Sequence, residues 1–368
     1  MHLCDLVPAH IGEIAPYQPG KPIAELAREL GMAPQRIVKL ASNENPLGAS
    51  PAALAAIDLE LGDLARYPDG SGYVLKAALS AKLGVAMAQI VLGNGSNDVL
   101  DMAARAFLYR GVSAVFSAHA FAVYPIAILT AGAEGITAPA HDYGHDLDAL
   151  LAAIRPDTRM VFIANPNNPT GTFLANADLL GFLQRVPGNV LVVLDEAYGE
   201  YLPADLQSDA LVWLSRFPNL IVTRTFSKAY GLAGLRVGYA LASAAVADMM
   251  NRVRQPFNVN SLALVAATAA LNDDEFIARS YAANQLGMRQ ISQGLLLLGI
   301  DYIPSFANFL AIRIGNATAM YRRLLEHGVI VRPIDNYAMP EYLRVSIGLA
   351  AENNQFLQAL EDVVKESV

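Results

Sequence analysis

Lys228 has the surroundings that most favour chemistry, because it stands among small and aromatic residues in TFSKAYG at 225–231. Such an amine, beside the end of a predicted strand, can lose its water shell, which lowers its pKa and makes it a nucleophile able to form a Schiff base. Ser227 and Arg236 add a hydroxyl and a bidentate guanidinium, which are good ligands for phosphate. A single lysine is usually a solvated surface residue, so this hypothesis depends on the other polar segments of the chain.

Asp195 directly follows the apolar run at 190–194 and is the second residue of interest. An aspartate at the end of a buried strand is costly unless a cation or a hydrogen-bond donor faces it. The protonated nitrogen of a pyridine ring is one such partner, and the pairing keeps the ring an electron sink. A metal ion and a helix N-terminus are the alternative partners for this carboxylate.

Two loops rich in glycine and asparagine add candidate ligands for a phosphate and for a ring. GNGSN at 93–97 precedes a predicted helix, so its backbone N–H groups and the positive helix end can approach an anion. Ser96 or Asn97 can cap that helix and donate to phosphate, although a plain strand-to-helix turn uses the same residue types. NPNNPTG at 165–171 contains two X-Pro steps, which make the loop rigid and point its asparagine amides in fixed directions. The glycine pattern is too incomplete for a dinucleotide-binding fingerprint.

The elements that must position these residues are visible as short apolar runs. Nearly continuous apolar strands imply burial on both faces, and hence a mainly parallel sheet between helices, with ligands bound at the carboxyl ends of the strands. A second region begins near residue 260 and mixes helical patterns with strands, which predicts a smaller α+β domain. We therefore expect an N-terminal segment at 1–35 that packs on the small domain, a large domain at 36–260 and the small domain at 261–368. The runs of the large domain are 90–92, 114–116, 160–163, 190–194, 220–222 and 237–240, and those of the small domain are 309–312, 329–331 and 342–346.

Composition excludes several classes of protein. The 368 residues are 54% hydrophobic and 16% charged, which predicts a globular chain, and a net charge of −8 without a basic run disfavours a nucleic-acid partner. Cys4 is the single cysteine, so an internal disulfide is excluded and a reducing compartment fits. We find no signal peptide and no apolar stretch of about 18 residues, and therefore expect a cytoplasmic protein without a membrane span. His141 and His145 are four residues apart in a loop-like segment with a glycine, so we expect no metal site.

The sequence resembles the fold-type-I, class-II pyridoxal-phosphate (PLP) aminotransferases and, among them, the histidinol-phosphate aminotransferase family. The resemblance covers almost the whole chain and rests on six segments. They are SNENPLG at 42–48, RYPDG at 66–70, NPNNPTG at 165–171, LDEAY at 194–198, RTFSKAYGLAGLRVGY at 224–239 and LRVSIG at 343–348. It implies an α/β fold with a seven-stranded, mainly parallel sheet sandwiched by helices, a smaller α+β domain and a homodimer.

The resemblance also implies the role of each candidate residue around the cofactor. Lys228 would bind PLP as an imine and shuttle the proton, and Asp195 would keep the pyridine nitrogen protonated. Tyr67 would reach the phosphate of the neighbouring subunit's cofactor. Phe121 is the candidate to stack on the ring, with Tyr124 as the alternative. Tyr198 and Asn168 would bond the phenolic oxygen, and Ser96, Asn97, Ser227 and Arg236 would bind the phosphate.

The same resemblance implies the substrates. Glutamate and 2-oxoglutarate would exchange the amino group with histidinol phosphate and imidazole acetol phosphate, in a ping-pong reaction of histidine biosynthesis. Arg344 would bind the substrate carboxylate or phosphate, with Arg332 and Tyr17 as partners of the substrate phosphate. The segment IDNYAMPEY at 334–342 is similar to one in members that accept aromatic amino acids, which leaves an aromatic aminotransferase as the alternative. A PLP decarboxylase of a phosphorylated amino acid shares much of the site and is the second alternative.

Overall fold

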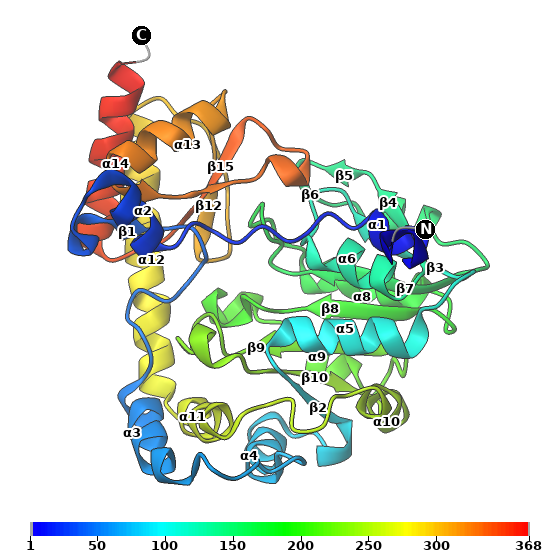
Figure 1. The fold of residues 1–368 in the computed structure, drawn as a ribbon. Helices are drawn as coiled ribbons and strands as arrows, with labels where there is room; N and C mark the ends of the chain where they lie inside the picture. The colour runs from blue at the N-terminus through cyan, green and yellow to red at the C-terminus, as the bar shows by residue number, and fades with distance from the viewer. Residues whose placement is uncertain (1–2, 367–368) are drawn as a thin grey trace.

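The structure, a computed structural model, describes residues 3–366 and contains a large and a small domain (Figure 1). The strands of the large domain are β2 (Ile90–Gly93), β3 (Ser113–Ser117), β4 (Glu134–Ala138), β7 (Thr158–Ala164), β8 (Leu191–Asp195), β9 (Leu220–Thr225) and β10 (Gly238–Ala242). They form one sheet in the order β2-β10-β9-β8-β7-β3-β4. Only β10 is antiparallel to its neighbours within this sheet, and the five strands from β9 to β4 are parallel. The predicted mainly parallel seven-stranded sheet is confirmed.

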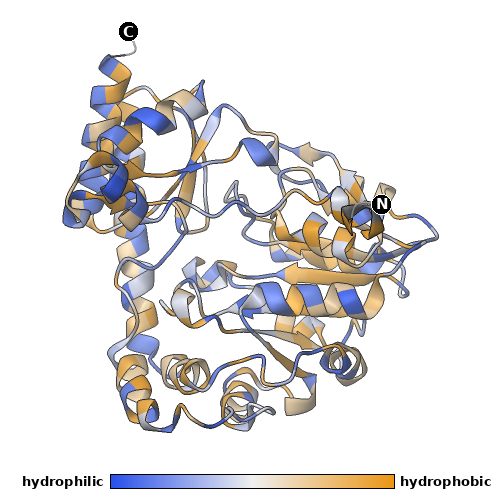
Figure 2. Ribbon diagram, viewed as in Figure 1, coloured by the Kyte–Doolittle hydropathy of each residue, from blue (hydrophilic) through white to orange (hydrophobic). Residues whose placement is uncertain are grey.

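The strands are apolar throughout because both faces of the sheet are covered by helices. In β8, Val192 and Leu194 belong to one core and Val193 to the other. Figure 2 shows the resulting hydrophobic character of the central strands. One face packs against α5 (Ser96–Phe107), α6 (Val123–Thr130) and α10 (Ala244–Arg252). The other packs against α4 (Tyr73–Leu83), α7 (Leu147–Ala152), α8 (Asn176–Arg185), α9 (Ala210–Trp213) and α11 (Ser261–Leu271), with α3 (Pro51–Glu60) packed on α11.

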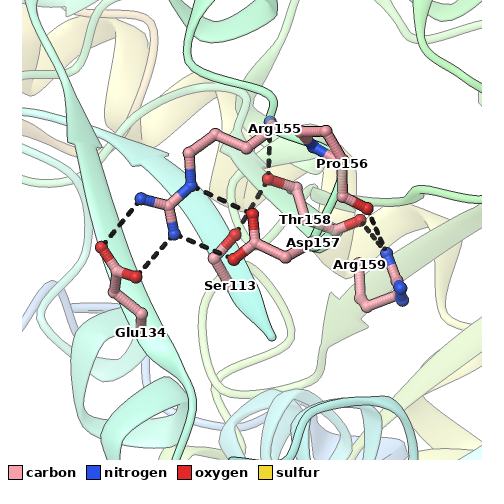
Figure 3. A network of polar contacts seen from close by, with 7 residues as sticks. All are labelled: Ser113, Glu134, Arg155, Pro156, Asp157, Thr158 and Arg159. Atoms are coloured by element: carbon pink, nitrogen blue, oxygen red, sulfur yellow. Dashed lines mark hydrogen bonds and ion pairs between the residues drawn. The ribbon is translucent and has the colours of Figure 1, made fainter. Parts of the chain in front are cut away.

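The edge strand β4 is the strand of this sheet for which the sequence shows no apolar run. Its residues are mostly exposed, whereas those of β2 at the opposite edge of the sheet are buried. Polar contacts of Arg155 join this edge to the neighbouring strands (Figure 3). The Arg155 guanidinium donates to both carboxylate oxygens of Glu134, at 3.1 and 2.5 Å, and to Asp157 at 3.0 and 3.1 Å. Within the pair β3 and β7, the hydroxyls of Ser113 and Thr158 are 2.9 Å apart.

The small domain has a four-stranded antiparallel sheet in the order β11-β12-β15-β14. Its strands are β11 (Tyr302–Ile303), β12 (Phe309–Arg313), β14 (Arg332–Pro333) and β15 (Tyr342–Ser346), and its helices are α12 (Asp274–Leu297), α13 (Ala317–Glu326) and α14 (Ala350–Lys365). Leu343 and Val345 of β15 point into the core between sheet and helices. Because side chains alternate along a strand, Arg344 and Ser346 lie on the opposite face.

The N-terminal part of the chain contacts both domains. β1 (Val38–Lys39) pairs in parallel with β13 (Val329–Ile330), and α2 (Ile23–Leu30) packs Leu26 and Ala27 against the same strand. The segment before α2 lies on the large domain, where α1 (Ala9–Gly12) is beside α6 (Figure 1). Residues 13–22 therefore bridge the two domains.

The two histidines at spacing four lie on a small hairpin of β5 (Ala140–His141) and β6 (Gly144–His145). His145 is buried with its Nε2 3.0 Å from the carbonyl oxygen of Ala164, and burial lowers the pKa of its ring to about 4. Within residues 3–366, no three His, Cys, Asp or Glu side chains are grouped so that they could hold a metal ion. In the same range, no helix combines the length and apolar character needed to cross a membrane.

Candidate active site

A cavity lies between the domains, at the carboxyl ends of β7, β8 and β9. This is the edge of a parallel sheet where ligands bind, because loops from several strands meet there. The cavity wall includes every candidate site residue except Tyr67. They are Tyr17, Ser96, Asn97, Phe121, Asn168, Asp195, Tyr198, Ser227, Lys228, Arg236, Arg332 and Arg344.

Lys228 stands in the loop after β9 with its amine inside the cavity. Its Nζ lies 3.1 Å from the carbonyl oxygen of Ser42 and 5.8 Å from the centre of the Tyr198 ring. Burial, together with the nearby Arg344 guanidinium, lowers the pKa of the Lys228 amine to about 8. The amine is thus neutral more often than that of an ordinary lysine at neutral pH, and a nucleophile requires the neutral form.

Asp195 closes β8 and is buried at the base of the cavity. Its Oδ1 accepts a hydrogen bond from the Thr223 hydroxyl and its Oδ2 one from the Tyr124 hydroxyl, both at 2.9 Å. Burial nevertheless raises the pKa of this carboxyl to about 6, because the two hydrogen bonds only partly offset the loss of water. A carboxylate has room for about four hydrogen bonds, so Asp195 can accept a further one from a cationic N–H donor.

The phosphate-binding candidates meet at the start of α5. Gly95 precedes this helix with φ of 83°, and within residues 3–366 no side chain caps its first turn. A Cβ on Gly95 would lie 2.3 Å from Nη2 of Arg236, so the absence of a side chain lets this guanidinium lie over the helix start. Nη1 of Arg236 also donates to the Ser227 hydroxyl at 3.2 Å. Free N–H groups, the helix dipole, an arginine and a hydroxyl together form a site for an anion.

Arg332 and Arg344 face each other at the other end of the cavity. They are register partners in the neighbouring strands β14 and β15, and both are largely buried. Arg344 donates to Asn168 Oδ1 at 2.6 Å and to the Ala41 carbonyl at 2.8 Å, and its Nε has no partner among the described residues. Arg332 donates to the Gln18 carbonyl, and its guanidinium lies 5.7 Å from the Tyr17 ring. Like charges directly opposite on paired strands destabilise a sheet unless an anion compensates them.

Comparisons with known proteins agree with this geometry. A family model described as aminotransferase class I and II matches residues 35–360. A histidinol-phosphate aminotransferase of Nitrosospira multiformis is 62% identical over 361 residues, which cover 98% of this chain and 92% of that protein. One of Thiobacillus denitrificans is 63% identical over 357 residues, which cover 97% and 93%. The chain belongs to the histidinol-phosphate aminotransferase family.

A solved structure of this family has the same fold. The histidinol-phosphate aminotransferase of Sinorhizobium meliloti, in complex with pyridoxal-5′-phosphate, matches with a TM-score of 0.90 and 30% identity over 99% of this chain and 98% of that chain. The predicted fold class is therefore confirmed. The cavity of this chain contains groups that suit this cofactor, namely the anion site of Arg236 and the α5 start, the buried Asp195 carboxylate and the Lys228 amine.

Phe121 and Tyr124 have different positions, although both touch the cavity. Tyr124 is fully buried, stacked 4.9 Å from Phe162 and bonded to Asp195, so its ring belongs to the base of the site. Phe121 is partly exposed to the cavity and meets the Tyr124 ring edge-on at 5.8 Å. This placement supports Phe121 as the residue that stacks on the cofactor ring in this aminotransferase.

Tyr67 is placed away from the cavity of its own chain. It is 81% exposed and stacks at 4.7 Å on Phe257. It lines a separate apolar hollow of about 1050 Å³, next to Leu264 and Val265 of α11. Tyr67 therefore does not contribute to the cavity of its own chain.

Three residues beyond the sequence candidates bond the groups of the site: Asn43 bonds the Tyr198 hydroxyl, Thr223 bonds Asp195, and the Ser42 carbonyl bonds Lys228. Tyr124, the alternative for ring stacking, bonds Asp195 instead. Asn43 stands in the SNENPLG segment, which carries part of the family resemblance. The resemblance indicates that the segment has a role, but it does not say which role Asn43 has. Thr223 lies in the middle of an apolar strand, where only the fold shows its neighbour.

Proposed function

We propose that this protein is a pyridoxal 5′-phosphate-dependent histidinol-phosphate aminotransferase. It would convert L-histidinol phosphate and 2-oxoglutarate to imidazole acetol phosphate and L-glutamate, as a step of histidine biosynthesis in the cytoplasm. The observation that carries this proposal is the opposed pair of Arg332 and Arg344 in the same cavity as Lys228 and Asp195. Two arginines facing each other suit a doubly charged phosphate monoester, which neutralises both.

The chemistry divides between the cofactor and the side chains around it. When bound, pyridoxal phosphate supplies the electron sink and holds the amino group between the two half-reactions. Lys228 holds the cofactor and, with its lowered pKa, can take and return the proton of the substrate α-carbon. Asp195 keeps a proton on the ring nitrogen, since a buried carboxylate gains most from a cationic partner. Tyr198 and Asn168 are placed for the phenolic oxygen of the ring.

The arginines at the far end of the cavity would select the substrates. Arg344 would bind the carboxylate of glutamate or 2-oxoglutarate and the phosphate of histidinol phosphate. Its guanidinium lines the cavity, where a substrate anion could reach it. Arg332 and Tyr17 would hold the phosphate alone. The ring of Tyr17 also covers the Arg332 guanidinium and limits its contact with water.

The segment that raised the aromatic alternative has a structural role in this chain. Ile334, Tyr337 and Met339 are buried with Ile303 and Tyr342 in one apolar cluster of the small domain. The segment therefore packs the small domain, and Tyr337 also lines a hollow with Tyr17 and Arg332.

A homodimer would complete the site. Tyr67 would reach across the interface to the cofactor phosphate of the partner. Large apolar side chains are exposed around Tyr67, as expected of a surface that another subunit covers. They include Leu54, Leu59, Leu61, Leu64 and Val74.

A substrate comparison tests the proposal. The pyridoxamine form of the enzyme is mixed, in single turnover, with imidazole acetol phosphate or with phenylpyruvate. We expect the phosphorylated acceptor to react faster by at least about two orders of magnitude, because an ion-paired phosphate contributes several kcal/mol that phenylpyruvate lacks. A preference for phenylpyruvate would refute the substrate and leave the aminotransferase chemistry intact. Release of carbon dioxide from O-phosphothreonine would indicate a decarboxylase instead.

A further inference from the structure

Asn43 is held by the small domain in a conformation that few residues adopt. Its φ is 55°, in the left-handed region that asparagine tolerates better than most side chains, and it is almost fully buried. Its backbone N–H donates to the Ser346 hydroxyl at 2.8 Å, and its carbonyl oxygen accepts from Asn308 at 3.1 Å. The strand that carries Arg344 therefore also fixes Asn43.

The same contacts determine which way the Asn43 amide faces. The Ser346 oxygen accepts from the Asn43 N–H, so its own hydrogen is free to be donated to Asn43 Oδ1, 2.9 Å away. With Oδ1 facing Ser346, the amide nitrogen Nδ2 faces Tyr198 and donates to its hydroxyl oxygen at 2.9 Å. The hydroxyl of Tyr198 is thus an acceptor from Asn43, and its hydrogen must point elsewhere.

The free hydrogen of Tyr198 can be directed only toward the cavity. Within residues 3–366, Tyr198 makes no other hydrogen bond through its hydroxyl, and it lines the cavity beside Lys228. Burial raises the pKa of Tyr198 to about 12, so the hydroxyl keeps its hydrogen at neutral pH. An acceptor in the cavity would receive it.

We propose that Asn43 is a positioning residue, which turns the Tyr198 hydroxyl so that it donates to the phenolic oxygen of pyridoxal phosphate. This inference deepens the proposed function and rests on the cofactor being held beside Lys228, but not on the identity of the substrate. Donation by Tyr198 disperses the negative charge of the phenolic oxygen. The phenolic oxygen then carries a weaker negative charge, so it stabilises the proton on the nitrogen that joins Lys228 to the cofactor to a smaller extent. The pKa of the chromophore therefore stays low.

The test is a titration of the visible absorbance of the holoenzyme between pH 5 and pH 10, without substrate. Asn43→Asp keeps the shape and the left-handed backbone but replaces the donor by an acceptor, which would draw the Tyr198 hydrogen away from the cofactor. We expect Asn43→Asp and Tyr198→Phe each to raise the pKa of the chromophore by about one unit, which corresponds to one hydrogen bond. The double variant should show no more than the larger single shift. The exposed Asn354→Asp makes the same chemical change on the surface and should leave the titration unaltered.

The double variant separates orientation from charge. If Asn43→Asp acted only through its negative charge, the shift of Tyr198→Phe would add to it, and such additivity would overturn the proposal. Asn43→Gly keeps the backbone without any side chain, and covers the case in which the aspartate variant folds poorly. It should raise the pKa by less than Tyr198→Phe does, because the hydroxyl loses its orientation and keeps its hydrogen. An unchanged pKa in Asn43→Gly would also overturn the proposal.

Discussion

The hydroxyl of Tyr124 donates a 2.9 Å hydrogen bond to Oδ2 of Asp195, and both side chains are buried beneath the cavity. Tyr124 comes from α6 and Asp195 from the end of β8, so the bond joins a helix to the sheet. Both residues line the cavity, so the bond holds the carboxylate in place at the cavity wall.

Tyr124→Phe should weaken cofactor binding without unfolding the protein. The variant removes one of the hydrogen bonds that hold a buried carboxylate in place, and a less well-held carboxylate should raise the Kd of pyridoxal phosphate by roughly tenfold. The Kd is measured by equilibrium titration of the apoenzyme with pyridoxal phosphate, followed by absorbance. Tyr109→Phe, on an exposed tyrosine, is the control and should bind like the wild type. Equal affinity of the two variants would show that the bond does not support Asp195.

The apoenzyme should be stabilised by Asp195→Asn, and more so at high pH. Between the ordinary pKa of 3.8 and about 6, the folded chain keeps a proton that the unfolded chain has released, so this group makes the free energy of unfolding fall as the pH rises. At pH values above about 6, the raised pKa of Asp195 lowers the free energy of unfolding by roughly 3 kcal/mol. Thermal unfolding of wild type and variant at pH 5 and pH 8 should show the larger gain in Tm at pH 8. Cofactor should then stabilise the wild type more than the variant, and an equal gain at both pH values would contradict the assignment.

Gly95→Ala should impair cofactor binding far more than it impairs stability. The new methyl group would lie 2.3 Å from the end of the Arg236 side chain, which can move away and thereby leave the phosphate site. Gly111→Ala is the control, since its φ of 96° is also positive while no atom lies within 4 Å of a Cβ built there. Both variants should lose about 1–2 kcal/mol of stability, and only Gly95→Ala should also raise the Kd of the cofactor. Equal cofactor affinities would exclude a role of Arg236 at this helix start.

Arg332→Gln should separate the two half-reactions. Removing one charge-assisted contact to phosphate should lower kcat/KM for L-histidinol phosphate by roughly a hundredfold, whereas L-glutamate, bound by Arg344, should change by less than about threefold. Stopped-flow absorbance of each half-reaction measures this ratio. The exposed Arg322→Gln serves as the control. A parallel loss in both half-reactions would place Arg332 in a structural role only.

Mixing two inactive variants tests the dimer. Lys228→Ala lacks the amine and Tyr67→Ala lacks the tyrosine proposed to act in the partner's site. A heterodimer of the two has one site with Lys228 and a complete Tyr67, so an equimolar mixture after subunit exchange should regain about a quarter of the wild-type activity. No recovery, with heterodimers demonstrated by native mass spectrometry, would mean that Tyr67 acts within its own chain or not at all.

Residue pattern alone was enough to predict the kind of fold and most of the residues that line the cavity. Apolar runs marked six of the seven central strands, and polar residues directly after them marked the sheet edge at which Asp195 and Lys228 meet. This worked because burial on both faces makes a strand uniformly apolar, and because the carboxyl ends of parallel strands lie together. The sequence pattern did not predict the edge strand β4, because a strand that is exposed to water need not be apolar.

Only the tertiary structure decided how residues from distant segments act on one another. The opposition of Arg332 and Arg344 is a matter of strand register, and the contact of Asn43 with Tyr198 spans 155 positions of the chain. Neither the direction of a hydroxyl hydrogen nor the loss of water around Lys228 follows from residue type. Both depend on which groups the packed domains bring within hydrogen-bond distance and which they shield from solvent.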